Sequence, residues 1–467
     1  MPDIRHFGRT AGPAVEETPD PPETDAPARR SFVVVTKDFS GLGWARRLVQ
    51  EGETVAVATT FEEDTPELNT QKKQVGQGWV LVLELTKAMA TLRSETTYWI
   101  FSENCFVDEA EELRAAGQKV FGVSTLSEKL EHDRDYATGI ATEAGLNPPP
   151  THDFKAREEG LAFLAEHPDQ SFVFKPDDGQ FNFMTFVPNA QDEAAANQQL
   201  ALYLQHMKEE PGDYILQERI PQQDALEVNV EAWMYEGEPF LATIGLEVKR
   251  KNTGDLGEMA GCGGDIMQFI PLDTPIVQQT IGKLFPFYKA EKYTGFADVN
   301  VLITPDGTPH FLEVCNRFGY NSHVTMLLGL ALDTVGNILA DYTDGSVGDL
   351  AARFRTDIGV SLTLFLDHPR PGLPIMVRPD MVDRFYPFDG AVDDDDTLLL
   401  TGYSDEVGIV VGAGPTVEAA ARTLLGEVLQ QESVLFPDMY CRTDLGSSDY
   451  LNAPACRYAA LQERGLL

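Results

Sequence analysis

Residues 310–319 read HFLEVCNRFG, and this stretch says more about the fold than any other in the chain. It predicts a short strand that ends with a carboxylate (Glu313), an amide (Asn316) and a guanidinium (Arg317) close together. Carboxylate and amide oxygens are ligands that Mg²⁺ prefers, and a bound cation can hold the phosphates of ATP. The alternative interpretation is an ordinary hairpin strand with polar residues at its solvated end.

The preceding segment, residues 293–304, reads YTGFADVNVLIT and predicts a neighbouring strand. Asp298 and Asn300 occupy alternating positions in it, so they point to the same face of the sheet. The turn-forming sequence Pro305-Asp306-Gly307 connects the two strands. Together the segments predict a hairpin that offers oxygen ligands from two adjacent strands.

Length and composition indicate a globular protein of about three domains, because 467 residues exceed what one core supports. No apolar run reaches the ~20 residues of a membrane span, and residues 1–30 lack the apolar core of a signal peptide. Residues 1–30 are rich in Pro, Glu and Asp and are expected to form a disordered acidic tail. The five cysteines are scattered, which argues against zinc and indicates reduced thiols in the cytoplasm.

The charge balance is strongly acidic, with 74 Asp and Glu against 36 Lys and Arg and a formal net charge of -38. Such a field repels nucleic acids and anionic membranes, so neither is expected as a partner. We interpret the acid as a solvated, halophile-like surface. An anionic substrate would then need a local group of cations.

The N-terminal part predicts a small doubly wound α/β domain at residues 31–128. Residues 31–36 (SFVVVT) form a short β-branched run, followed by the turn Ser-Gly-Leu-Gly at 40–43 and a helical pattern through Leu48. Two glycines without a complete dinucleotide fingerprint favour a plain strand-to-helix turn over a phosphate-binding loop. Further strands are expected at 55–59, 79–85, 98–101 and 119–123, with a helix at 108–116.

The central part contains several candidate anion-binding cations. Residues 130–150 predict one helix that carries Arg134 and ends at Gly145 and the prolines 148–150. The run FVFKP puts Lys175 at the end of a buried strand, where an unpaired ammonium is costly, so a phosphate or a carboxylate partner is expected.

Two strands and a glycine-rich segment follow. The strands are expected at residues 214–220 (YILQERI) and 226–235 (LEVNVEAWMY), and the second carries alternating polar residues. Residues 248–265 (VKRKNTGDLGEMAGCGGD) combine five glycines with Lys249, Arg250 and Lys251, which predicts a loop that wraps an anionic ligand.

In this order the segments resemble the phosphoribosylamine–glycine ligase (glycinamide ribonucleotide synthetase) family of the ATP-grasp superfamily. The resemblance is collinear from about residue 31 to about residue 450, and it is also carried by residues 114–137 (RAAGQKVFGVSTLSEKLEHDRDYA), 406–420 (EVGIVVGAGPTVEAA) and 440–446 (YCRTDLG). It implies an α/β N-terminal domain, an α+β ATP-grasp region at 129–345 with a lid subdomain at about 150–222, and a mixed α/β C-terminal domain at 346–467.

The resemblance also implies an activity and its residues. In that family a carboxylate attacks the γ-phosphate of ATP, and an amine then displaces phosphate from the acyl phosphate, as a step of purine biosynthesis. The implied substrates are a small carboxylate and a small amine, and the implied assembly is a monomer or a weak homodimer. The implied cofactors are ATP and Mg²⁺, with Mn²⁺ as an alternative metal. The implied site residues are Arg134, Lys175, Glu218, Ile220 and Glu227 for ATP, Asn300, Glu313 and Asn316 for the metal, and Arg317, Lys249 and Arg250 for the carboxylate or acyl phosphate.

The chain departs from the family pattern at four places. Residues 36–44 (TKDFSGLGW) stand where the family has Gly-Arg-Glu-His, and residues 177–187 (DDGQFNFMTFV) replace a glycine-rich lid loop. The metal strand reads Glu-Val-Cys-Asn, which puts Cys315 rather than Asn316 on the face of Glu313 unless a bulge intervenes. Residues 320–323 (YNSH) replace Asp-Pro-Glu.

These departures keep three hypotheses open: the purine enzyme itself, a paralogous ATP-grasp ligase that joins an amino acid or other carboxylate to a different amine, and a catalytically inactive nucleotide-binding protein.

Overall fold

The computed structural model describes residues 30–467 except 64, 177–184, 209–211, 221–224, 380, 431–433, 437 and 450–452. The acidic tail through residue 29, most of the lid segment 177–187 and the connection 221–224 therefore lie outside the described residues. The chain divides into two compact units, and each is made of separate stretches of sequence. Unit 1 contains residues 1–125, 247–269 and 317–455, and unit 2 contains residues 126–246, 270–316 and 456–467.

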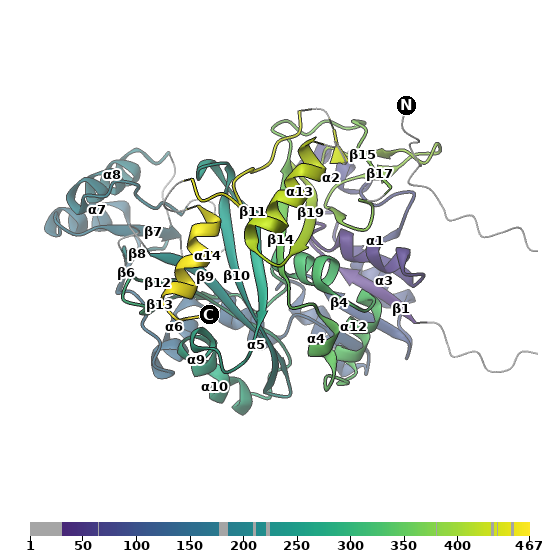
Figure 1. Ribbon diagram of the computed structural model, residues 1–467, viewed down its shortest axis with the longest axis horizontal. Helices are drawn as coiled ribbons and strands as arrows, with labels where there is room; N and C mark the ends of the chain where they lie inside the picture. The colour runs from purple at the N-terminus through teal and green to yellow at the C-terminus, as the bar shows by residue number, and fades with distance from the viewer. Residues whose placement is uncertain are drawn as a thin grey trace, which may run out of the picture. The chain divides into compact units, whose positions relative to one another are not determined.

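Unit 1 begins with a parallel five-stranded sheet in the order β3-β2-β1-β4-β5. Figure 1 labels β1 and β4 of this sheet together with the helices α1, α3 and α4. All four strand pairs are parallel, and the helices between them form crossover connections, which confirms the predicted doubly wound α/β domain. Val33, Trp99 and Phe101 belong to its buried core. The strands are β1 (Ser31–Val35), β2 (Thr54–Thr59), β3 (Leu81–Glu84), β4 (Thr97–Phe101) and β5 (Lys119–Phe121), and the helices are α1 (Leu42–Gln50), α2 (Pro66–Lys72), α3 (Leu85–Thr91) and α4 (Val107–Ala115).

The remainder of unit 1 is mainly antiparallel. Strands β11 (Leu256–Ile270), β14 (Ile358–Phe365), β19 (Glu406–Gly414) and β16 (Phe385–Pro387) are neighbours in that order. Helix α13 (Val417–Leu425) packs on β14 and β19 through its buried face. Two small two-stranded sheets pair β15 (Met376–Val377) with β20 (Val434–Leu435) and β17 (Ala391–Val392) with β18 (Leu398–Leu399).

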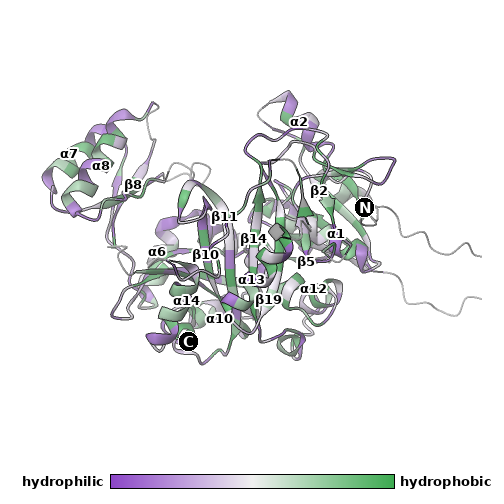
Figure 2. Ribbon diagram, turned by 45° about the horizontal axis from the view of Figure 1, so that its top comes forward, coloured by the Kyte–Doolittle hydropathy of each residue, from purple (hydrophilic) through white to green (hydrophobic). Residues whose placement is uncertain are grey.

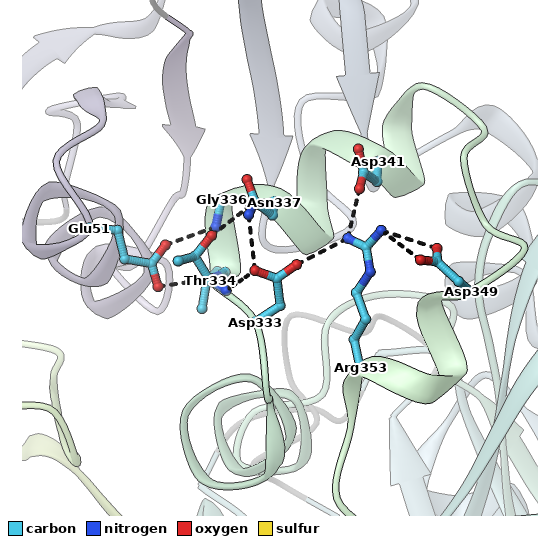
Figure 3. A network of polar contacts seen from close by, with 9 residues as sticks. Glu51, Asp333, Thr334, Gly336, Asn337, Asp341, Asp349 and Arg353 are labelled. Atoms are coloured by element: carbon cyan, nitrogen blue, oxygen red, sulfur yellow. Dashed lines mark hydrogen bonds and ion pairs between the residues drawn. The ribbon is translucent and has the colours of Figure 1, made fainter.

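A polar network fixes helix α12 (Val335–Thr343) against the N-terminal part of unit 1 (Figure 3). The Glu51 carboxylate accepts hydrogen bonds from the backbone N–H groups of Val335 and Gly336, each at 2.9 Å, so it occupies the positive end of the helix. On the other side, the Arg353 guanidinium binds the carboxylates of Asp333, Asp341 and Asp349.

Unit 2 contains an antiparallel sheet in the order β13-β12-β9-β10, formed by β9 (Leu226–Tyr235), β10 (Glu238–Asn252), β12 (Gly295–Ile303) and β13 (Pro309–Val314). A second sheet, in the order β6-β8-β7, consists of β6 (Thr151–Phe154), β7 (Phe172–Pro176) and β8 (Tyr214–Glu218). Helices α7 (Arg157–Glu166) and α8 (Glu193–His206) accompany that sheet, and both alternate hydrophobic with hydrophilic residues in Figure 2. The other helices are α5 (Thr125–His132), α6 (Arg134–Glu143), α9 (Pro275–Gln279), α10 (Phe285–Ala290) and α14 (Pro454–Glu463).

The strands expected at 214–220, 226–235, 293–304 and 310–319 are therefore present, and so is the turn at 305–307. Together with the parallel N-terminal sheet they agree with the expected ATP-grasp architecture. In the described part of the chain, no helix combines the length and the apolar character that a membrane crossing needs.

The helix expected within residues 130–150, with Arg134 in its first turn and an end at Gly145, is present as α6, which begins at Arg134 because the Asp133 side chain accepts a hydrogen bond from the N–H of Tyr136 at 3.0 Å. Residues 130–132 belong instead to the preceding helix α5. One expectation about local structure was wrong. The glycine-rich loop expected at 248–265 is a hairpin of two long strands, with only residues 253–255 between them. A Cβ on Gly263 would lie 2.5 Å from the carbonyl oxygen of Arg250, so glycine here permits close strand pairing and does not mark a loop.

Candidate functional site

A cluster of charged side chains surrounds Lys175 in unit 2. Lys175 lies in β7, and its side chain is half-buried. Burial lowers the pKa of the Lys175 ammonium, the nearby Glu313 carboxylate opposes that change, and the Arg134 guanidinium adds to it. Glu227 contributes a second carboxylate. Three of the residues implied by the family resemblance, on α6, β9 and β13, are therefore close enough to act on the charge of a fourth, Lys175 on β7.

Arg134 supplies the clearest sign of a missing acceptor. It is the first residue of α6, which Asp133 caps. Its Nη1 atom is buried and has no hydrogen-bond partner among the described residues. A buried guanidinium nitrogen without an acceptor is costly, and an anionic oxygen would satisfy it. Two cations side by side also favour an anion, because the anion would relieve their mutual repulsion.

Two of the residues that the resemblance implies for ATP, Glu218 and Ile220, lie at the end of β8 or just after it. Glu218 pairs in register with Phe172 on β7, and its N–H donates to the carbonyl of Pro150 at 2.8 Å. Ile220 is half-buried and immediately precedes residues 221–224, which lie outside the described residues. Their contact with a nucleotide therefore stays a prediction.

Two of the three expected metal ligands are brought together. Asn300 and Glu313 pair across β12 and β13, and the Asn300 amide nitrogen lies 3.3 Å from a Glu313 carboxylate oxygen. The same amide nitrogen lies 3.8 Å from the sulfur of Cys315. An exposed carboxylate and an amide beside the Lys175 cluster fit Mg²⁺, which is often bound by one or two carboxylates together with substrate phosphates. The described residues contain no group of three or more His, Cys, Asp or Glu placed to hold a metal ion.

Asn316, the third expected ligand, points elsewhere. It is 2% exposed, its Oδ1 accepts from the N–H of Asp298 at 3.1 Å, and its amide nitrogen lies 3.1 Å from the Tyr288 hydroxyl. The irregularity in the β12–β13 register falls before Glu313, and the Cys315 N–H still donates to the Asp298 carbonyl at 3.1 Å. Strand alternation therefore continues, and it puts Cys315 on the face of Glu313. The bulge that would have realigned Asn316 is not present.

The basic residues of the β10–β11 hairpin have partners within unit 1. Lys249 forms an ion pair with Glu247, and Arg250 donates to the carbonyl of Gly257 at 2.8 Å. Lys251 binds Asp405 at 2.6 Å. Because neighbouring acids and carbonyls occupy these cations, a role for Lys249 and Arg250 in anion binding requires that the ligand displace those partners.

Arg317 lies in unit 1, on the wall of a pocket of about 220 Å³. Three separate segments form the pocket: the residues after β1, the residues after β4 and the residues that follow β13. β1 and β4 are adjacent strands whose crossover connections leave in opposite directions, so the pocket lies at the topological switch point of the parallel sheet. The lining residues are Asp38, Ser40, Trp44, Ser102, Glu103, Arg317, Phe318, Gly319 and Tyr320.

Two carboxyl groups dominate the pocket. Burial and the neighbouring Glu103 raise the pKa of Asp38 to about 8. Burial alone would also raise the pKa of Glu103, but hydrogen bonds from Asp38, Ser40 and Thr36 lower it instead. When the pair carries one proton, that proton is therefore mainly on Asp38, and Glu103 is ionised.

The sequence interpretation did not single out Asp38 or Glu103. A usable signal was present, because both follow buried strands directly, in the runs TKDFS and FSENC. The carboxyl ends of adjacent parallel strands meet at one sheet edge, where ligands of this fold class bind. What was missing was the strand order, since only that order makes β1 and β4 neighbours.

Comparison with known proteins agrees with this architecture. No family model matches the chain. A curated relative, the phosphoribosylamine–glycine ligase of Ralstonia nicotianae, is 25% identical over 345 residues, which cover 71% of this chain and 79% of the relative.

Solved structures share the fold at lower identity. The phosphoribosylamine–glycine ligase of Thermotoga maritima superposes with a TM-score of 0.62 at 17% identity and covers 89% of this chain and 99% of its own. The L-amino acid ligase of Bacillus licheniformis superposes with a TM-score of 0.53 at 16% identity and covers 87% of this chain and 98% of its own. Ligases named for different substrates thus share this fold.

Proposed function

We propose that this chain, a distant member of the phosphoribosylamine–glycine ligase family with the ATP-grasp fold, is an ATP-dependent ligase that joins a carboxylate to an amine. The observation that carries the proposal is the cluster of Arg134, Lys175, Glu227 and Glu313 in unit 2, with a buried guanidinium nitrogen of Arg134 for which the described residues supply no acceptor. Phosphate oxygens of ATP would supply that acceptor and would separate the two like charges.

In the proposed reaction the protein neutralises the charge of the phosphate groups and aligns the reacting groups. Lys175 and Arg134 bind phosphate oxygens, while Glu218, Ile220 and Glu227 bind the nucleoside. The carboxylate substrate attacks the γ-phosphate, and ADP leaves. The amine nitrogen then forms the new C–N bond, phosphate departs with the electrons of the C–O bond, and the amine gives up a proton. Glu313 and Asn300 would hold a divalent cation, which when bound neutralises phosphate charge.

Arg317 is proposed to bind the carboxylate or acyl phosphate, and Lys249 and Arg250 are further candidates for the same anion. The more specific proposal, which rests on similarity to the curated relatives, is phosphoribosylamine–glycine ligase activity in purine biosynthesis. The competing assignment is a paralogous ligase with another amine, and the altered segment 36–44 favours it. Retention of nucleotide binding without any turnover would instead identify an inactive nucleotide-binding protein.

Nucleotide titration of variants tests the proposal. Lys175→Ala and Arg134→Ala should each weaken ATP binding roughly ten- to hundredfold, because each removes a charge-assisted hydrogen bond. Lys155→Ala is the matched control, since Lys155 is 84% exposed and pairs loosely with Asp213 at 3.9 Å. Equal ATP affinity in all three variants would mean that Lys175 and Arg134 are structural cations.

Release of ADP tests the chemistry. The wild-type protein should release ADP when ATP and Mg²⁺ are supplied with the correct carboxylate and amine, and the Lys175→Ala variant should not. Glycine with freshly prepared phosphoribosylamine is the first pair to assay, and other amino acids follow. ADP release with a different amine, but not with phosphoribosylamine, would replace the purine assignment by the paralogue.

A further inference from the structure

The pocket at the switch point of unit 1 carries a charge pattern that selects a class of amine. Its boundary includes two carboxyl groups, Asp38 and Glu103, and Arg317 is the one basic residue among the described residues that line it. At about 220 Å³ the pocket is smaller than the ~300–1,000 Å³ of sites for drug-sized ligands, so it fits a small metabolite.

Glu103 occupies the hydrogen-bond donors that a phosphate would need. Its carboxylate accepts from the Thr36 hydroxyl at 2.6 Å, from the Lys37 N–H at 2.8 Å and from the Ser102 hydroxyl at 2.9 Å. The Ser40 hydroxyl, just before α1, donates to the same carboxylate. The loop after β1 therefore binds an internal anion at the place where a phosphate-binding turn would bind an external one.

The negative potential extends to the neighbours of the pair. Burial raises the pKa of Tyr320, and the carboxylates of Glu406, Asp38 and Glu103 raise it further. Burial likewise raises the pKa of the Cys105 thiol, again with a contribution from Glu103. A phosphate group entering the pocket would lie at close range to the ionised carboxylate of Glu103, and like charges at such distances are mutually destabilising.

The remaining walls suit an ammonium group. Trp44, Phe318 and Tyr320 contribute aromatic surface, and the Trp44 and Phe318 rings lie 5.7 Å apart. Aromatic faces and carboxylates both attract cations. Arg317 lies on the same boundary and supplies a partner for a carboxylate. An amino acid carries both complementary charges, whereas a simple diamine carries only the ammonium groups.

We propose that this pocket binds the amine substrate as an ammonium ion between Asp38 and Glu103, so that the substrate is an amino acid or another small primary amine without a phosphate group. The inference rests on the proposed ligase function, because it assigns the amine of that reaction. It also separates this chain from a ligase for a phosphorylated sugar amine, since the pocket provides carboxylates where a phosphate would require donors.

Direct binding to the full-length protein tests the pocket. Thermal-shift and calorimetric titrations would use the twenty amino acids and putrescine as ammonium probes, and ribose 5-phosphate and inorganic phosphate as anionic probes. We expect at least one ammonium probe to bind and the anionic probes not to compete with it. Asp38→Asn and Glu103→Gln should each weaken that binding roughly tenfold or more. Asp108→Asn, an exposed change in the first turn of α4, should leave it unchanged.

Two further comparisons between variants test the proposal. Arg317→Ala should weaken the binding of an amino acid but should not weaken the binding of putrescine, which separates the two kinds of amine. If Glu103→Gln does not fold, because Glu103 accepts several hydrogen bonds, Asp38→Asn decides alone, since the amide oxygen of asparagine still accepts the hydrogen bond that the Ser40 N–H donates to Asp38. The inference is overturned if no ammonium probe binds the wild type, or if ribose 5-phosphate binds and Glu103→Gln strengthens that binding. Failure of ATP to bind would instead overturn the proposed function, and the amine titrations would still decide the inference.

Discussion

At the scale of single residues, strand alternation separates the two asparagine positions expected at the metal. Asn300 shares a face with Glu313, whereas Asn316 is buried against Tyr288. Sequence alone could state the alternatives but could not choose between them, because one inserted residue reverses every later side chain in a strand. The choice depended on where the register irregularity falls, and it falls before Glu313.

Substitutions along this strand should therefore have different consequences. Glu313→Gln should raise the Mg²⁺ concentration needed for half-maximal ADP release roughly tenfold, because it removes a ligand charge. Asn316→Ala should lower the free energy of unfolding by about 1–3 kcal/mol, since it leaves buried polar groups without partners, and should not change the Mg²⁺ requirement. A raised Mg²⁺ requirement in a folded Asn316→Ala variant would restore Asn316 as a ligand.

His323 provides a pH-dependent prediction at the same scale. It is 0% exposed, and its Nδ1 accepts a hydrogen bond from the N–H of Gly319 at 2.6 Å. Burial, together with the Arg317 charge, lowers the pKa of His323 to about 3. Between that value and the ordinary value near 6.5 the unfolded chain binds more protons than the folded one. The stability contributed by neutral His323 is therefore complete above about pH 6.5 and is lost as the pH falls toward 3.

His323→Asn keeps an acceptor for Gly319 but removes the titration. We expect the wild type to be more stable than this variant near neutral pH, and the difference to shrink by up to ~1.4 kcal/mol per pH unit as the pH falls from 6.5. Urea unfolding of both proteins across that range measures the difference. Parallel stability curves would show that His323 titrates normally.

At the scale of secondary-structure elements, the sequence predicted the parallel strands of the N-terminal domain well. Runs such as SFVVVT and TYWIF are β-branched or aromatic, and they are bounded by turn residues. It failed for residues 248–265, because glycine and charge are typical of loops, whereas here the glycines allow β10 and β11 to approach closely. Likewise the pocket beside Arg317 could not be predicted, since Asp38 and Glu103 are brought together by strand order and not by spacing in the chain.

The β10–β11 hairpin is held within unit 1 by Arg442, which is 0% exposed. Arg442 donates to Asp444 at 2.9 and 2.7 Å and to Asp255 at 2.8 Å, and Asp444 also accepts from the N–H of Gly254 at 2.9 Å. The arrangement ties the hairpin turn to the segment 442–444. Because Asp444 is 3% exposed, loss of the guanidinium would leave a buried carboxylate without its partner.

Arg442→Met should therefore lower the free energy of unfolding by about 3–5 kcal/mol. Arg370→Met is the matched control, because Arg370 pairs with Asp438 at 2.6 Å while the two side chains remain 54% and 75% exposed. That exposed pair should contribute less than about 1 kcal/mol. Urea unfolding measures both variants, and equal losses would mean that burial does not distinguish the two ion pairs.

At the scale of the whole molecule, the net charge of -38 is expected to lower the free energy of unfolding at low salt. Acidic residues on a folded surface repel one another more strongly than in the expanded unfolded chain, so net charge of this size disfavours the compact state. Ions screen that repulsion over ~10 Å at 0.1 M salt and over ~3 Å at 1 M. Stability should therefore increase as salt is added.

We expect the Tm to rise by roughly 4 °C or more between 0.05 and about 1 M KCl, a shift that corresponds to at least ~1 kcal/mol for units of this size. Most of the rise should occur at the lower concentrations, because screening saturates once the screening length falls below the spacing of surface charges. NaCl at the same ionic strength should act alike, since screening depends on ionic strength and not on the cation. Sucrose, which is excluded from protein surfaces without screening charge, controls for a general effect of added solute. A Tm that is flat in both salts would show that the acidic surface carries no repulsive cost, and the halophile-like interpretation of the composition would then fail.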